Sequence, residues 1–243
     1  MRPHDLAHPM PASTPIPIVI LPGLDGTGDL FKDFAEALGP GFRTIVVRYP
    51  TDVALDYAGL EPLVRAALPA DEPFVLLAES FSGPLGVSLA ASAPPGLRGL
   101  VLSASFVHNP HPLLPSLMPL VARMPFSKVP KNALLWWFLG GYSTPALRRQ
   151  LMDVIFRVAP DVLRSRLHTV RHADAREALV HLDIPVLYLQ ASQDRVVPRQ
   201  ASELVARLRP RTRVVRFQAP HFLLQSAPAK AAETVATFAR EVI

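Results

Sequence analysis

Residues 74–83 have the sequence FVLLAESFSG, an apolar run that ends in an acidic residue and a turn of small residues. Continuous apolar runs of this length are typical of strands that are covered on both faces of a sheet. The segment that follows, residues 83–93, has helical periodicity, so a strand, a serine turn and a helix are predicted in succession. Five more runs of the same kind are found at residues 16–21, 43–49, 98–104, 184–190 and 212–217.

Helix-like segments lie between these runs. Residues 29–38 place Leu30, Phe34 and Leu38 on one face and end before Gly39 and Pro40. Strands that alternate with helices imply right-handed crossovers and a parallel sheet. The predicted fold class is α/β, a doubly wound and mostly parallel sheet of about six strands. The remaining predicted helices cover residues 56–68, 83–93, 199–208 and 228–241.

The alternation stops between residues 106 and 182. This stretch contains no convincing strand and begins with several prolines, and a structureless loop of that length is uncommon inside a compact domain. We therefore predict a helical cap over 106–182, inserted into an α/β core formed by 16–105 and 183–243. Residues 1–15 contain four prolines and no periodicity, and we expect a flexible tail there. The helices predicted in the insertion cover residues 131–140, 145–158 and 160–171.

The composition excludes several classes of protein. Of the 243 residues 49% are hydrophobic and 19% are charged, which excludes a disordered chain. Because cysteine is absent, a disulfide scaffold and a cysteine nucleophile are excluded as well. The longest apolar stretch, residues 133–141, is about half of the ~20 residues that span a bilayer, and no secretory signal is visible. A soluble, cytoplasmic protein is expected.

The serine turn after the run at 74–79 is the first candidate for chemistry. A serine on a sharp strand-to-helix turn, with small residues two positions away on each side, is typical of a nucleophile elbow. Here Ser80 is flanked by Ala78 and Ser82, where the usual pattern has glycines. Ser82 is a rival nucleophile, but Pro84 is bulkier than such a turn favours, so Ser80 is preferred. An ordinary serine-rich helix start is the simpler alternative.

Two further candidates follow later strands. Asp194 lies in the loop after the run at 184–190, and His221 follows the run at 212–217. Either residue alone is more often incidental, since aspartate commonly stabilises turns. Their order in the chain, Ser80 then Asp194 then His221, together with their places at carboxyl ends of strands, favours a catalytic triad.

The first strand is followed by a glycine-rich loop, residues 21–28, with the sequence LPGLDGTG. It lacks the lysine of a phosphate-binding loop and the third glycine of a dinucleotide fold, so we expect no nucleotide. The alternative is an oxyanion loop, in which the backbone N–H of Leu24 pairs with that of Phe81. His108 and His111 have metal-like spacing, but Pro110 interrupts any helix there and no third ligand is near. Neither a metal nor a cofactor is predicted.

Over residues 16–243 the chain resembles the α/β-hydrolase superfamily. The resemblance rests on LPGLDGTG, AESFSG, QDRVVP and APHF, which occur in family order. It implies that Ser80 is the nucleophile, that Asp194 and His221 complete the triad, and that the helical insertion is the family's cap. The chain departs from the family at the two outer glycines of the elbow, and the family's opening hairpin is not expected. The LDGTG and ESFSG segments also resemble a branch with esterases and plastid acyltransferase-like proteins.

The function this predicts is hydrolysis of a carboxylic ester or thioester with an apolar acyl group. Acyl transfer through the same acyl-enzyme remains an alternative, as does a non-catalytic ligand-binding protein on the same scaffold. Trp136, Trp137 and Phe138 are candidates for the substrate pocket, although aromatic residues on a short helix are more often core.

The insertion is also basic. It holds ten basic and four acidic residues, a balance of +6 against −1 for the rest of the chain. The simpler interpretation is a solvated helical face. The alternative is a partner that carries the acyl group on an anion: an acidic carrier protein, a CoA thioester or an anionic lipid surface. Nucleic acid is not expected, because no basic stripe is interleaved with aromatic residues. The basic residues are Arg123, Lys128, Lys131, Arg148, Arg149, Arg157, Arg164, Arg166, Arg171 and Arg176.

Overall fold

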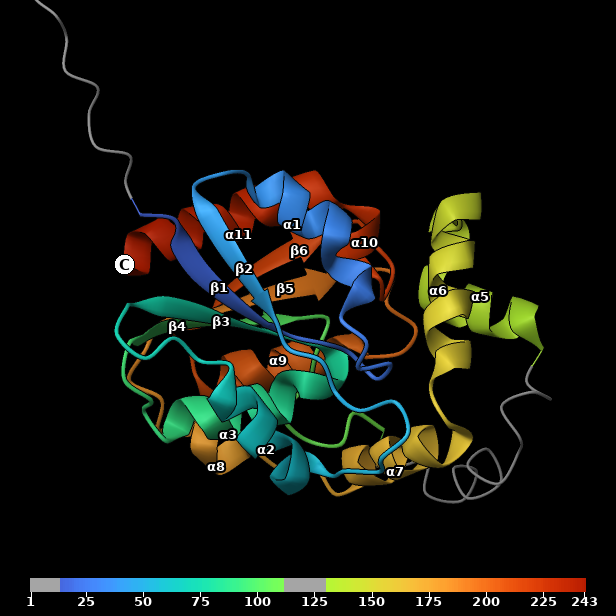
Figure 1. Cartoon of the computed structure of the whole chain (residues 1–243), viewed down its shortest axis with the longest axis horizontal. Coiled ribbons are helices and arrows are strands. Elements are labelled where there is room, and N and C mark those ends of the chain that lie inside the picture. The colour runs from blue at the N-terminus through green and yellow to red at the C-terminus, as the bar shows by residue number, and fades with distance from the viewer. Residues whose placement is uncertain (1–13, 112–129) are drawn as a thin grey trace, which may run out of the picture.

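The computed structural model describes residues 14–111 and 130–243. Its centre is a sheet of six parallel strands in the order β2-β1-β3-β4-β5-β6, so the predicted fold class is confirmed (Figure 1). The predicted strand at residues 43–49 is shorter in the structure, where β2 ends at Val46. The strands are β1 (Ile16–Leu21), β2 (Phe42–Val46), β3 (Phe74–Glu79), β4 (Leu97–Ser103), β5 (Val186–Ala191) and β6 (Arg213–Phe217).

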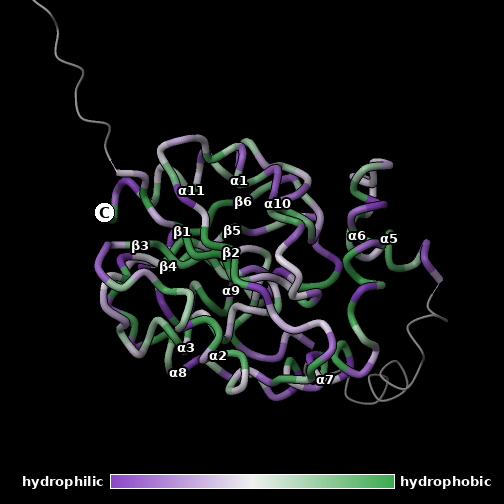
Figure 2. The backbone as a smooth tube through the Cα atoms, in the orientation of Figure 1, coloured by the Kyte–Doolittle hydropathy of each residue, from purple (hydrophilic) through white to green (hydrophobic). Residues whose placement is uncertain are grey.

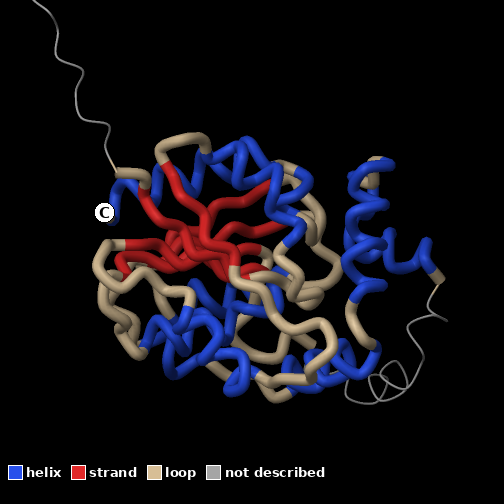
Figure 3. The backbone as a smooth tube through the Cα atoms, viewed as in Figure 1, coloured by secondary structure: helices blue, strands red, loops and turns tan. Residues whose placement is uncertain are grey.

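Helices cover both faces of the sheet (Figure 3). Along β1, Ile18 and Ile20 pack into the core on one side while Val19 and Leu21 pack into the core on the other. Burial of both faces explains why the strands are continuous apolar runs, and Figure 2 shows the central strands hydrophobic along most of their length. One face carries α1 (Lys32–Leu38), α10 (Leu223–Ser226) and α11 (Pro228–Val242); the other carries α2 (Tyr57–Ala66), α3 (Gly83–Ala91), α8 (Arg176–Val180) and α9 (Arg199–Leu208).

A helical insertion follows β4 and lies beyond the carboxyl ends of the strands (Figure 1). Its main helices are α5 (Lys131–Leu139), α6 (Pro145–Arg157) and α7 (Pro160–Arg171). The start of α6 is fixed by Thr144, whose side chain accepts the Leu147 amide at 3.2 Å. Leu151 and Val154 of α6 form a small core with Phe222 of the sheet domain. The insertion is thereby packed against the edge of the sheet where the candidate residues lie.

Several sequence-based predictions concern residues outside the described ranges. Most of the predicted tail, residues 1–15, lies outside them, and so do residues 112–129 of the insertion. The exact boundaries of a separate cap, 106–182, therefore stay a prediction. Within residues 14–111 and 130–243, no helix has both the length and the apolar character needed to cross a bilayer.

Candidate active site

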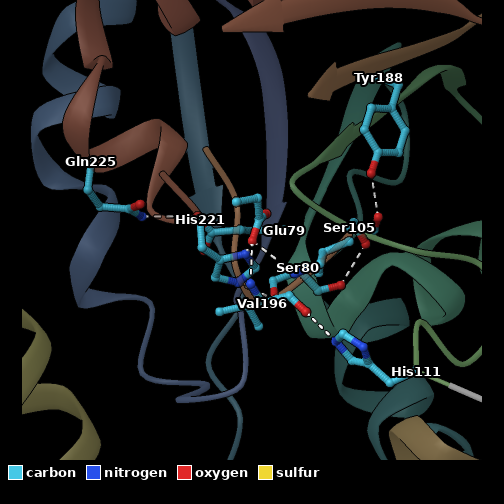
Figure 4. A network of polar contacts seen from close by, with 10 residues as sticks. Glu79, Ser80, Ser105, His111, Tyr188, Val196, His221 and Gln225 are labelled. Carbon is cyan, nitrogen blue, oxygen red and sulfur yellow. Dashed lines mark hydrogen bonds and ion pairs between the residues drawn. The ribbon is translucent and has the colours of Figure 1, made fainter. Parts of the chain in front are cut away.

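Ser80 occupies a strained turn directly after β3. Its φ of 47° lies in the left-handed region, which non-glycine residues rarely adopt and which is found preferentially at functional sites. The single 3-10 turn Ser80–Ser82 then leads into α3. The Ser80 carbonyl accepts the hydroxyl of Ser105 at 2.6 Å, which holds the turn against the end of β4 (Figure 4).

The glycines missing from the elbow are replaced by glycines farther along α3. A Cβ on Gly86 would lie 2.8 Å from the Cβ of Ala78, so the helix approaches the strand closely despite the extra methyl group. A Cβ on Gly83 would overlap the Ser105 hydroxyl. The departure from the usual pattern therefore leaves the sharp turn intact. The spacing of Gly83 and Gly86 after the serine is the sequence signal for this compensation.

The three predicted triad residues are brought together. The Oγ of Ser80 lies 2.9 Å from Nε2 of His221 (Figure 4). Nδ1 of His221 lies 2.8 Å from Oδ2 of Asp194. Oδ1 of Asp194 accepts the amides of Val196 and Val197, each at 2.8 Å. The serine, acid and histidine follow β3, β5 and β6 respectively, so parallel pairing places all three at one edge of the sheet.

The environment of His221 favours its charged form. Burial lowers the pKa of the imidazole, but the charge of Asp194, its hydrogen bond and the charge of Glu79 together raise that pKa above its ordinary value. His221 is 4% exposed. An imidazole that is hydrogen-bonded on one nitrogen to a buried carboxylate and on the other to a hydroxyl can accept the hydroxyl proton.

Glu79 is a second buried acid at this site, and sequence reasoning did not select it. Burial raises its pKa to about 7, and the hydrogen bond from Gln225 Nε2 to Oε1, 3.1 Å long, opposes that rise (Figure 4). The side chain lines the same cavity as Ser80 and His221. An acidic residue directly before the candidate nucleophile, at the end of a wholly buried strand, is the sequence signal for it.

The glycine-rich loop forms a tight turn beside the elbow. The Gly26 amide donates to the Gly23 carbonyl at 3.1 Å, which places Leu24 and Asp25 at the centre of the turn. Leu24 and Phe81, the two residues whose amides are the oxyanion candidates, line the cavity together with Ser80. The Asp25 carboxylate accepts the amide of Thr27 at 2.9 Å, so it stabilises the loop locally.

The cavity over Ser80 is about 240 Å³ in volume. Two of the three predicted pocket residues, Trp137 and Phe138, line it, and the Phe138 ring packs edge-on against His221 at 5.6 Å. Trp136 does not line it: the side chain is 56% exposed, with the Arg195 guanidinium 4.4 Å from its ring centroid. Apolar side chains from the core and the insertion make up most of the wall, among them Leu30, Phe106, Leu134, Leu151, Val154, Ile155, Leu163, Leu167 and Val170.

The rival nucleophile Ser82 and the two candidate metal-binding histidines make other contacts, although His111 also lines the cavity. The Ser82 hydroxyl is buried between the hydroxyl of Tyr49, at 2.7 Å, and the carbonyl of Pro22. Nε2 of His111 lies 2.7 Å from the Val196 carbonyl, whereas His108 pairs with Asp174 in an isolated β-bridge. In the part of the chain that the structure describes, no three or more histidine, aspartate or glutamate side chains cluster as metal ligands would.

Comparison with known proteins defines the class. The model of the Alpha/beta hydrolase family matches residues 18–234, and the chain belongs to this family. It is 30% identical over 228 residues to the pimeloyl-[acyl-carrier protein] methyl ester esterase of Neisseria meningitidis serogroup B (strain H44/76), covering 89% of this chain and 79% of that protein. It is 27% identical over 240 residues to the enzyme of the same name from Yersinia pseudotuberculosis serotype O:1b (strain IP 31758). That match covers 92% of this chain and 93% of the Yersinia protein. Among solved structures, the esterase EaEST from Exiguobacterium antarcticum is similar in fold, with a TM-score of 0.78 and 16% identity. The match covers 93% of this chain and 92% of EaEST.

Proposed function

We propose that this protein is a serine esterase that hydrolyses carboxylic esters of apolar acyl groups through an acyl-enzyme on Ser80. The observation that carries the proposal is the hydrogen-bonded series Ser80–His221–Asp194, at the base of an apolar cavity, with the serine held at positive φ. Membership of a hydrolase family and similarity to named esterases support the same conclusion.

In the first half of the proposed reaction, Nε2 of His221 takes the Oγ proton of Ser80 as Oγ bonds to the acyl carbon. The tetrahedral intermediate then collapses, the bond to the alcohol oxygen breaks, and His221 returns the proton to that oxygen. In the second half, water gives a proton to His221 as its oxygen bonds to the acyl carbon. The bond between the acyl carbon and Oγ then breaks and His221 returns the proton to Oγ, which releases the acid and restores the Ser80 hydroxyl. Asp194 keeps the imidazole oriented and stabilises its cation throughout.

The negative charge that develops on the acyl oxygen needs donors nearby. We assign this role to the backbone N–H groups of Leu24 and Phe81, because both residues line the cavity together with Ser80. A donor of this kind is typically worth about 10²–10³ in rate. No metal or cofactor takes part in these steps.

The substrate class follows from the cavity and from the relatives. The wall is mostly apolar, so we propose an aliphatic acyl chain, as an ester or a thioester. The relatives at 27–30% identity are named for an ester carried by an acyl carrier protein, and we propose such a carrier as the partner here. Arg148 and Arg149 of α6 are exposed and form no ion pair among the described residues, so they can contact an acidic carrier.

One part of the charge expectation needs correction. Arg166 is counted among the ten basic residues of the insertion, but its side chain is buried and offers no surface to a partner. Arg157 is paired with Asp29 of the core at 2.7 Å. Arg123 and Lys128 lie outside the described residues. We place the proposed contact with a carrier on Arg148 and Arg149, two adjacent exposed arginines of α6.

The first test is hydrolysis of p-nitrophenyl esters of short and medium acyl length. Ser80→Ala is expected to abolish turnover without changing the melting temperature, since losing the nucleophile removes the covalent route. Ser82→Ala is the matched control and should retain turnover. A fully active Ser80→Ala variant would overturn the proposal. A wild-type chain with no turnover on any ester or thioester would favour the ligand-binding alternative.

A second assay separates hydrolysis from acyl transfer. Both reactions use the same acyl-enzyme and differ in whether water or an alcohol attacks it. The enzyme is given an acyl donor and a long-chain alcohol, and the free acid and the new ester are quantified. We expect the acid to dominate. Ester as the main product in water would replace the esterase proposal by an acyltransferase.

A further inference from the structure

Arg166 is a charged side chain of the insertion that is buried inside the core's loops. It lies on α7 and is 1% exposed, the largest of the fully buried side chains in the described residues. Its Nη1 donates to the carbonyls of Leu24 and Asp25, both at 2.8 Å, and its Nη2 donates to the carbonyl of Pro50 at 2.8 Å. The guanidinium therefore joins α7 to the two central residues of the glycine-rich turn.

The turn is shaped around this guanidinium. Gly26 has a φ of +72°, and a Cβ there would lie 2.7 Å from Nη1 and 2.9 Å from Nη2 of Arg166. The ring of Tyr49 covers the guanidinium at 5.7 Å. Only glycine at position 26 both adopts this backbone conformation and leaves room for the arginine. The glycine of the LDG segment is thereby explained by Arg166.

Anchoring α7 alone does not require a charge at this position. Arg166 forms no ion pair within the described part of the chain, and its Nε has no hydrogen-bond partner there. Burial lowers the pKa of Arg166 more than the charge of Asp25 raises it, so the cost of burying this cation is only partly offset. A well-packed apolar side chain would join helix and loop without that cost. A guanidinium can in addition orient the peptide groups that it binds, because its donors are held in a rigid plane.

We propose that Arg166 is a positioning residue for the esterase reaction: it holds the Gly23–Gly26 turn so that the Leu24 N–H faces the acyl oxygen at Ser80. This inference rests on the proposed function. Because Arg166 belongs to the insertion and Leu24 to the core, the oxyanion site is complete only when α7 is docked. The insertion then contributes to the rate as well as to the choice of substrate.

The test compares Arg166→Ala, Arg166→Lys and the control Arg164→Ala on a neutral p-nitrophenyl ester. Arg164 is on the same helix, exposed and paired with Asp161, so its loss leaves the turn untouched. We expect Arg166→Ala to lower kcat by about 10²-fold, as for the loss of one oxyanion donor, with KM nearly unchanged. Added guanidinium ion should restore part of kcat in Arg166→Ala and none in Arg164→Ala. Lysine is a point charge that cannot fix both peptide planes, so Arg166→Lys should be intermediate.

A readout that is independent of turnover keeps this inference separate from the proposed function. Hydrogen exchange is measured at the Gly26 and Tyr49 amides, which bond to the Gly23 and Gly26 carbonyls respectively. We expect faster exchange at both amides in Arg166→Ala, and in Arg166→Lys if the alanine variant does not fold. Unchanged exchange rates would overturn the role of Arg166. The role would also be overturned if the Arg166→Ala variant changed only KM and the melting temperature and added guanidinium restored no activity. An inactive wild type with faster exchange in the variants would overturn only its link to catalysis.

Discussion

Glu79 and His221 are two titratable side chains that face one cavity beside the candidate nucleophile, and each affects the charge of the other. The charge of Glu79 contributes to the raised pKa of His221. His221 must be neutral to accept the Ser80 proton, so kcat/KM is expected to rise with pH through the pKa of His221. In Glu79→Gln the anion is absent, and this rise should move to lower pH.

The measurement is a pH profile of kcat/KM with a neutral ester for wild type and Glu79→Gln. Glu72→Gln is the matched control, because Glu72 is exposed and paired with Arg43, away from the cavity. Its profile should coincide with that of wild type. If the profile of Glu79→Gln also coincides with that of wild type, the charge of Glu79 has no effect on the pKa of His221.

The same buried acid makes stability depend on pH. Its pKa of about 7 in the folded chain lies above its ordinary value of 4.5, so the folded state binds the proton more tightly. The resulting stabilisation is fully present below pH 4.5 and is lost as pH rises through about 7. Between pH 5 and 8 the free energy of unfolding of wild type should therefore fall by at most about 3 kcal/mol relative to that of Glu79→Gln. Urea unfolding at several pH values measures this difference, and a constant difference would contradict it.

Asp194 provides a further residue-level prediction. In Asp194→Asn the imidazole loses its anionic partner and can adopt the wrong tautomer, so kcat should fall by about 10⁴-fold. The fold should be retained, because the amide oxygen can still accept the Val196 and Val197 amides. Far-UV circular dichroism tests whether the fold is retained, and ester turnover tests the loss in kcat. Activity within tenfold of wild type would remove Asp194 from the mechanism.

At the scale of the elements, the sequence predicts the strands well because both faces of the sheet are buried. The bounds predicted for 16–21 and 74–79 agree with β1 and β3. The run at 43–49 is longer than β2 because the chain leaves the sheet: the Tyr49 amide donates to Gly26 in the glycine-rich loop. The helices α8 and α10 are not among the predicted helices, because their five and four residues are too few to show a helical period.

The candidate site was predictable where chain order carries the information and not where it depends on packing between elements. Ser80, Asp194 and His221 each follow a strand, so a parallel sheet brings them to one edge. The charge pattern predicts Arg166 on a charged surface, whereas the structure buries it on one helix face with Val162, Leu163 and Thr169. An arginine on the apolar face of a predicted helix is the signal that could have found it.

The close contact between α3 and the end of β4 gives a prediction at this scale. A methyl group on Gly83 would overlap the Ser105 hydroxyl and lie 2.5 Å from the Phe106 carbonyl. Gly83→Ala should therefore destabilise the fold by about 1–3 kcal/mol, as overpacking does, and lower turnover because Ser105 holds the Ser80 carbonyl. Gly41→Ala is the control, since its nearest neighbour is 4.0 Å away. Equal unfolding free energies for the two variants would show that α3 can shift without cost.

For the whole molecule, the insertion lies beyond the carboxyl edge of the sheet (Figure 1). Its helix α6 carries the exposed residues Arg148 and Arg149. Attraction between exposed charges is screened by salt, with a Debye length of about 8 Å at physiological ionic strength. We expect kcat/KM for an ester on an acyl carrier protein to fall steeply with added salt, while that for a neutral ester stays nearly flat.

Charge reversal at Arg148 and Arg149 to glutamate should reproduce the loss at low salt. Reversal of Arg207 and Arg211 is the control, because Arg207 in the last turn of α9 and Arg211 in the loop before β6 are exposed and lie at the opposite edge of the sheet. Equal salt curves for the two donors, or equal effects of the two double variants, would leave the basic residues as a solvated helical face.

The central claim is that Ser80 is the nucleophile of an acyl-enzyme, and labelling by a fluorophosphonate probe tests it most directly. The probe forms a bond to an activated serine oxygen, and peptide mass spectrometry identifies the modified residue. We predict one adduct per chain, located on Ser80, that is absent in Ser80→Ala and strongly reduced in His221→Ala. No adduct on the folded wild-type chain, or an adduct on Ser82 or another serine, would contradict the account.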